Sequence, residues 1–170
     1  YKKIDSLSSL AAKYVATNEY DKMVSSLGAK RTNAYTWIDQ TVYVNDIPSN
    51  GIEKWLKLES ERFSELVLRL FHTELEAVYE EFNIGQNDVY RKINKTVNEA
   101  LFPNHPYGTQ STIGKGEHLK TPSMEKIHEY FNTYYVPNNM AIVLAGDFDP
   151  DKVIPMIEKY FGNYKTKKVP

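Results

Sequence analysis

The chain has 170 residues, of which 41% are hydrophobic and 25% are charged. These proportions are typical of a globular protein and exclude wholesale disorder and collagen-like structure. Because the chain contains no cysteine, disulfides, thiolate metal sites and a cysteine nucleophile are excluded. The formal charge of -1 provides no basic field for nucleic acid, and no apolar run approaches the ~20 residues of a membrane span.

The N-terminal part of the chain predicts two helices. Apolar residues at three- and four-residue spacing indicate an amphipathic helix over residues 4–15. Asn18 stands where it can cap a shorter helix over residues 19–27. Gly28 follows at the position that a helix C-cap glycine occupies, so the second helix is expected to end there.

The spacing of apolar residues then changes to alternation, which predicts two short strands over residues 33–38 and 40–45. A run of proline, serine, asparagine and glycine breaks the chain after them. The helix expected next has an apolar stripe that extends from Ile52 to Phe63.

In the second half, the sequence Thr73–Glu76 fits a capping box and predicts a helix that passes Phe82 and extends towards Asn98. Residues 109–120 are expected to form an exposed loop. Pro122 stands at the position preferred for the first residue of the next helix.

The run Met140–Gly146 is almost continuously apolar, which indicates a central strand covered on both faces, and a last helix is expected over Asp151–Phe161. Helices and strands alternate irregularly. We therefore predict an α+β fold in which helices pack on one face of a mostly antiparallel sheet. No repeat or linker divides the chain, so residues 1–170 are expected to form a single domain.

Two acidic residues on the helix after Thr73 are the candidate functional residues. Glu74 and Glu81 are seven residues apart, so they lie on nearly the same side of the helix, on either side of Val78 in its apolar stripe. A carboxylate beside a core is costly unless it is paired or bound to a cation. Two explanations stay open from spacing alone: both side chains reach sideways to a lysine or arginine, or one binds a metal ion and the other orients the site.

Four motifs occur in a fixed order. In chain order they are the strand Gly28–Thr36 with the pattern G-x-x-x-x-N-A-x-T, the helix with the paired glutamates followed by Phe82, the turn Leu101–Gly108, and the segment Tyr134–Asp147 with Y-Y-x-P-x-N-M…G-D. In this order they resemble the motifs of the insulinase/pitrilysin-like zinc metallopeptidases, the inverzincins. The resemblance covers about residues 18–164.

The resemblance implies a metallopeptidase-type α/β roll and a zinc-dependent endopeptidase in the full-length protein. Glu81 would be the third zinc ligand and Glu74 the residue that orients the site. Asn33, Ala34 and Thr36 would lie on the strand along which the family binds an extended peptide, by main-chain pairing. The implied cofactor is zinc, the substrate a peptide or unfolded protein, and the partner a second homologous domain or subunit.

The family's H-x-x-E-H motif is absent, since no histidine of this chain is followed by another four residues later. In the family this motif lies upstream of the segment that resembles Gly28–Thr36. We therefore expect a C-terminal portion of the first catalytic-type domain, inactive and lacking zinc by itself. The alternative is a non-catalytic scaffold or partner subunit, against which the retention of both glutamates argues. The sequence leaves the compartment open, with a bacterial periplasmic or secreted location expected.

Overall fold

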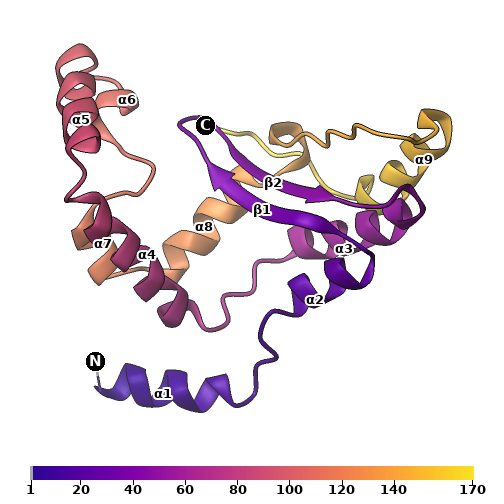
Figure 1. The fold of residues 1–170 in the computed structure, drawn as a ribbon, viewed down its shortest axis with the longest axis horizontal. Helices are drawn as coiled ribbons and strands as arrows, with labels where there is room; N and C mark the ends of the chain where they lie inside the picture. The colour runs from indigo at the N-terminus through magenta and orange to yellow at the C-terminus, as the bar shows by residue number, and fades with distance from the viewer. Residues whose placement is uncertain (1) are drawn as a thin grey trace. The chain divides into compact units, whose positions relative to one another are not determined.

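The computed structural model describes residues 2–170, and the side chains of these residues except those of Lys2, Ile4, Asp5 and Ser8. The fold is α+β and mostly helical (Figure 1). In chain order the elements are α1 (Lys2–Ala12), α2 (Glu19–Ser26), β1 (Lys30–Thr36), β2 (Thr41–Asp46), the 3-10 helix η1 (Ser49–Gly51), α3 (Ile52–Ser64), α4 (Phe71–Gly85), α5 (Val89–Leu101), α6 (Pro106–Thr109), α7 (Gly116–Lys120), α8 (Met124–Tyr134), the 3-10 helix η2 (Pro137–Asn139) and α9 (Pro150–Phe161).

The mostly antiparallel sheet expected from the sequence is corrected to a two-stranded hairpin. Over the described residues the sheet consists of β1 and β2, and the Trp37 N–H donates to the Gln40 oxygen at 2.7 Å where the strands meet. Arg31 and Asp46 form an exposed ion pair of 3.5 Å across the hairpin. The predicted central strand Met140–Gly146 is not paired with either strand, so it adds nothing to this sheet.

The end of α2 confirms the prediction for Gly28, and α2 begins at Glu19 with Asn18 as its N-cap residue, as predicted. Gly28 has a φ of +84°, and its N–H donates to the Ser25 oxygen at 2.9 Å. A left-handed φ suits glycine because it has no Cβ. Asn18 also has a positive φ, of 58°, and its side chain makes no capping hydrogen bond.

The predicted capping box at Thr73 is wrong, because α4 begins two residues earlier, at Phe71. The helix expected to extend towards Asn98 is divided into α4 and α5. Asp88 caps α5, and its carboxylate accepts hydrogen bonds from the N–H groups of Tyr90 and Arg91 at 2.8 and 3.1 Å. An aspartate that satisfies two free N–H groups favours a new helix start over continuation of the old one.

Two other boundaries also differ from the expectation. The short helix α7 lies within residues 109–120, which were expected to form a loop throughout. Pro122 lies outside α8, because Ser123 is the N-cap and its hydroxyl oxygen accepts from the Lys126 N–H at 3.2 Å. A side-chain cap of this kind fixes the start of a helix more firmly than the proline preference does.

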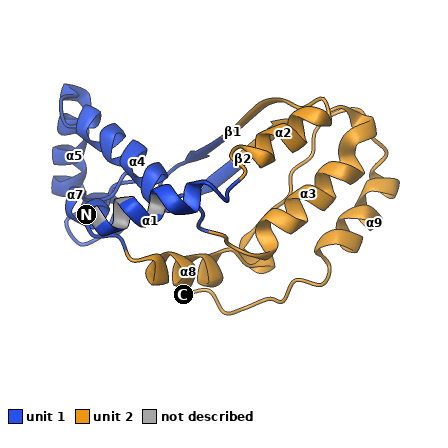
Figure 2. Ribbon diagram, turned by 90° about the horizontal axis from the view of Figure 1, so that it is seen from below, with its two compact units in different colours: residues 1–15, 34–42, 68–122 blue, residues 16–33, 43–67, 123–170 orange. Residues whose placement is uncertain are grey.

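The described chain divides into two compact units (Figure 2). Unit 1 contains α1, the tip of the hairpin (residues 34–42) and α4 to α7. Unit 2 contains α2, the rest of the hairpin, α3, α8 and α9.

The core of unit 2 lies between α3 and α9. Leu56 has 0% of its surface exposed, and it packs with Ile52 and Val153 in one buried cluster. Partly buried side chains surround this cluster: Ile47, Trp55, Leu144, Phe148, Met156, Ile157, Tyr160 and Phe161. The apolar faces of the amphipathic helices α3 and α9 thus cover each other.

Replacing Leu56 by alanine is expected to destabilise unit 2 by about 3 kcal/mol, because the substitution removes a fully buried side chain and leaves a cavity. Urea unfolding followed by circular dichroism measures the change. Ile154→Ala on α9, where the side chain is 60% exposed, is the control and should change stability by less than about 1 kcal/mol. Equal losses in the two variants would show that the α3–α9 contact is not the core of this unit.

Candidate functional site

The two candidate glutamates lie on α4 in unit 1. Both are exposed, and neither carboxylate has an ion pair or hydrogen bond with another described residue. Val78 between them is 38% exposed, so this part of α4 borders solvent and not a core. The explanation in which both side chains reach sideways to a lysine or arginine therefore does not hold over the described residues. Both carboxylates are available for a ligand.

Packing against α7 fixes which side of α4 the glutamates occupy. A Cβ on Gly116 would lie 2.9 Å from Cε1 of Phe82, so the glycine lets the ring lie against the α7 backbone. The rings of Tyr79 and Phe82 are stacked with centroids 6.3 Å apart. At 3.6 residues per turn, Glu74 and Glu81 lie within about 20° of each other and roughly 100° from this contact. The helix therefore presents the pair beside its packed face and not within it.

The three residues proposed to bind substrate, Asn33, Ala34 and Thr36, lie on β1, as predicted. All seven residues of β1 are exposed, and β2 is its neighbour in the described sheet. Exposed strands of this kind can accept an extended peptide through main-chain pairing.

The tip of the hairpin is tied to the turn after α5, within unit 1. The Tyr107 hydroxyl donates to Oδ2 of Asp39 at 2.7 Å, and this hydrogen bond raises the pKa of Tyr107. His105 Nδ1 accepts from the Tyr107 N–H at 3.2 Å, so His105 caps α6. Sixty-eight residues separate Asp39 from Tyr107, and no local sequence pattern announces the contact.

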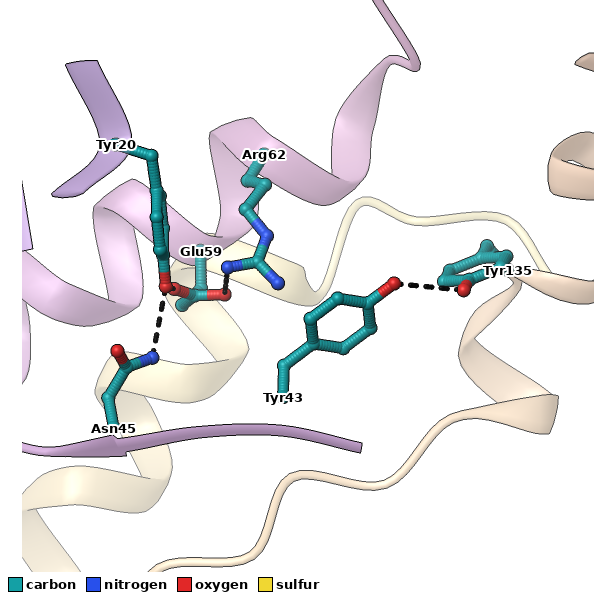
Figure 3. A network of polar contacts seen from close by, with 6 residues as sticks. All are labelled: Tyr20, Tyr43, Asn45, Glu59, Arg62 and Tyr135. Carbon is teal, nitrogen blue, oxygen red and sulfur yellow. Dashed lines mark hydrogen bonds and ion pairs between the residues drawn. The ribbon is translucent and has the colours of Figure 1, made fainter. Parts of the chain in front are cut away.

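A buried carboxylate anchors β2 in unit 2 (Figure 3). Glu59 of α3 is 4% exposed, and its Oε1 accepts from the Tyr20 hydroxyl at 2.5 Å. Asn45 of β2 donates from Nδ2 to the Tyr20 oxygen at 3.0 Å, and Arg62 lies 3.4 Å from Oε2 of Glu59. Burial, followed by the hydrogen bond to Glu59, raises the pKa of Tyr20 to about 12.

The Arg62 guanidinium extends this network over a group of aromatic rings (Figure 3). It lies 4.4 Å from the ring centroid of Tyr20, 4.3 Å from that of Tyr43 and 4.9 Å from that of Phe63. The hydroxyls of Tyr43 and Tyr135 are 3.0 Å apart. Because β2 contributes Tyr43 and Asn45, the network holds this strand against α2 and α3. Sequence reasoning missed it, since its only local signal is an acid–base pair three residues apart on α3.

The described residues do not form a complete metal site. Among them, no group of three or more histidine, cysteine, aspartate or glutamate side chains is arranged to hold an ion. Zinc in proteins takes three or four side-chain ligands, so Glu81 lacks the companions it would need. The donor set of this chain alone therefore does not fit zinc. Over the same residues, no helix combines the length and apolar character required to span a bilayer.

Comparison with known proteins shows what the chain is similar to. Residues 123–170 match the family model described as "Peptidase M16 inactive domain". The zinc protease PqqE of Helicobacter pylori is 25% identical over 170 aligned residues, which span 96% of this chain and 37% of the relative. The uncharacterized zinc protease ML0855 of Mycobacterium leprae is 25% identical over 133 residues, 77% of this chain and 30% of that protein. The chain thus spans about a third of the length of these relatives.

Solved structures share the fold. The crystal structure of a protease from Helicobacter pylori superposes with a TM-score of 0.81 at 26% identity, over 89% of this chain and 38% of that one. The first half of the periplasmic protease PqqL from Escherichia coli gives a TM-score of 0.78 at 21% identity, over 89% of this chain and 34% of that one. The two sequence relatives are described as zinc proteases, and the two solved structures as proteases. The resemblance to the M16 (pitrilysin/insulinase) peptidase family is thus confirmed, with the family model itself matching residues 123–170.

Replacing Glu59 by alanine is expected to destabilise the chain by about 3 kcal/mol, because it leaves the partly buried Arg62 without its ion pair and the Tyr20 hydroxyl without its acceptor. The free energy of unfolding in urea measures the loss. Glu61→Ala removes an exposed carboxylate from the same helix and should lie within about 0.5 kcal/mol of the unmodified chain. The anchoring role of Glu59 would be contradicted if the two variants unfolded at the same urea concentration.

Proposed function

We propose that this chain supplies the C-terminal portion of the catalytic-type domain of a zinc-dependent endopeptidase and is inactive by itself. In the complete enzyme, Glu81 would be the third zinc ligand and Glu74 would orient it. The H-x-x-E-H helix, with two ligands and the general base, would come from polypeptide outside this sequence. Hydrolysis of peptides by metal-activated water would then require both parts.

The observation that carries this proposal is the exposed, unpaired pair of carboxylates on one side of α4. The pair occurs in a chain that covers 38% of the Helicobacter pylori protease, on which it superposes with a TM-score of 0.81. A helix that presents one ligand and one orienting carboxylate to solvent is suited to a site whose other ligands lie on a separate segment.

A non-catalytic scaffold or partner subunit of the same family is the second candidate. The description of the matched family model as an inactive domain favours it. That match covers residues 123–170, however, and neither Glu74 nor Glu81 lies within it. The two candidates differ in one feature: the gene of a peptidase encodes H-x-x-E-H upstream of the segment described here, and the gene of a scaffold subunit does not.

The proposed substrate is an extended peptide or unfolded segment that pairs with β1, where Asn33, Ala34 and Thr36 are exposed. The proposed partner is a second homologous domain or subunit that covers the substrate. The chain superposes on the first half of PqqL, and the whole of PqqL contains a further half. This supports a second domain or subunit as the partner. The periplasmic location in the description of PqqL belongs to that protein, and for this chain a periplasmic or secreted location is a proposal.

The isolated chain is expected to bind zinc weakly, because a single carboxylate cannot replace the water shell of the ion. Isothermal titration of the chain with zinc chloride should show no saturation in the micromolar range. A tight, one-to-one titration would contradict the proposal that the remaining ligands lie elsewhere.

In the full-length protein, Glu81→Gln is expected to abolish both zinc retention and hydrolysis of a fluorogenic peptide, since it removes a direct ligand. Glu74→Gln should lower zinc affinity roughly 10- to 100-fold, the usual effect of losing a group that orients a ligand. Zinc content after dialysis, measured by atomic emission, reports both effects.

Glu80→Gln is the matched control, because Glu80 is an exposed acid on the same helix outside the pair. It should retain zinc and activity. A Glu81→Gln protein with full zinc content would refute the assignment of Glu81 as a ligand.

A further inference from the structure

The tip of the hairpin, residues 34–42 of unit 1, exposes most of its side chains. Residues 34–41 are all exposed, and Trp37 and Ile38, which follow β1, are each more than half exposed. A two-stranded hairpin by itself is only marginally stable in water. The geometry of β1, the strand proposed to pair with the substrate, therefore depends on the contacts that hold the tip.

A short, charge-assisted hydrogen bond ties the tip to the turn after α5. The Tyr107 hydroxyl donates to Oδ2 of Asp39 at 2.7 Å. A hydrogen bond with an ionised partner is roughly twice as strong as one between neutral groups. The same bond raises the pKa of Tyr107 above its usual value, so the hydroxyl remains a donor at neutral pH.

The turn that carries Tyr107 is held from several sides. The Phe102 N–H donates to the Asn98 oxygen at 2.8 Å, and the Gly108 N–H donates to the His105 oxygen at 3.0 Å. The Tyr107 ring lies edge-to-face with the rings of His105 and Phe102, with centroids 4.4 and 5.7 Å away. A Cβ on Gly108 would collide with the backbone oxygen of Phe102, so glycine allows the turn to close. The hydroxyl is thus presented from a preorganised support.

We propose that Asp39 and Tyr107 are positioning residues for the peptide substrate. With its tip tied, β1 keeps the extended geometry that main-chain pairing with a peptide requires. Without the tie, the strand would have to be ordered when the peptide binds, and that entropic cost would weaken binding. The two residues act through β1 and not on the reacting atoms. This inference rests on the proposed function, because it concerns the strand with which the substrate is proposed to pair.

Tyr107→Phe in the full-length protein tests the inference, because it removes the hydroxyl and keeps the ring. The KM for a fluorogenic peptide should rise about fivefold, the effect of losing one exposed hydrogen bond. The kcat should stay within about twofold, since the tie affects peptide binding and not the chemical step. An unchanged KM, or a lower kcat at unchanged KM, would overturn the inference.

Matched variants show whether the hydrogen bond itself is responsible. Tyr90→Phe removes the hydroxyl of an exposed tyrosine on α5 and should leave KM unchanged. Asp39→Asn keeps a side-chain oxygen that can accept and should largely preserve KM, whereas Asp39→Ala should raise KM as Tyr107→Phe does. Because the two residues act as one pair, the Asp39→Ala/Tyr107→Phe protein should be no worse than either single variant. Multiplication of the two single effects would refute the pairing.

Hydrogen–deuterium exchange separates positioning from a purely structural role. In the chain studied by itself, amides of residues 34–42 should exchange severalfold faster in Tyr107→Phe, because the tip opens more often. A peptide from α9 around Val153, buried within unit 2, is the internal reference and should not change. Equal exchange of the tip in both proteins would overturn the inference. Faster exchange of the tip with an unchanged KM would mean that the contact is structural only, and would overturn it as well.

The proposed function and this inference fail in different ways. An active enzyme whose KM is insensitive to Tyr107→Phe would refute the inference alone. A full-length protein without peptidase activity would refute the proposed function, and its affinity for a fluorescein-labelled unstructured peptide, measured by fluorescence anisotropy, then replaces KM. Binding about fivefold weaker in Tyr107→Phe would still support positioning. Equal affinities, or no binding by the unmodified protein, would overturn it.

Discussion

The buried apolar contact between α3 and α9 organises unit 2, while many large apolar side chains elsewhere in the described chain are exposed. The fully buried contact between α3 and α9 stabilises unit 2. Elsewhere, apolar stripes face water, as along α5, where the exposed residues recur at four-residue spacing: Val89, Ile93, Val97 and Leu101. Such a stripe is the usual core-facing side of an amphipathic helix. In this structure the stripe is exposed.

Local patterns predicted the elements whose partners lie nearby in the chain. The change from helical spacing to alternation located β1 and β2. Gly28 marked the end of α2, because the positive φ at that position suits glycine and depends on no distant contact. The apolar stripe of α3 was also correct. In each case the information is contained within a few turns of helix or one hairpin, so no distant contact was needed.

The features that sequence reasoning missed depend on contacts between distant residues. Tyr20 and Glu59 are 39 residues apart, and Asp39 and Tyr107 are 68 apart. The predicted sheet failed for a related reason: a strand pattern shows that a segment can pair, but pairing also needs a second strand beside it. Met140–Gly146 has the pattern and lacks that neighbour among the described residues.

The paired glutamates and the segment Met140–Gly146 differ in how much of their structure the local sequence determines. The register of Glu74 and Glu81 follows from the geometry of one helix, so it does not depend on any other element. A metal site and a sheet, in contrast, are shared structures that several segments must build together. Among the described residues, no acidic or histidine side chains join Glu81 in a metal-binding group, and Met140–Gly146 has no neighbouring strand.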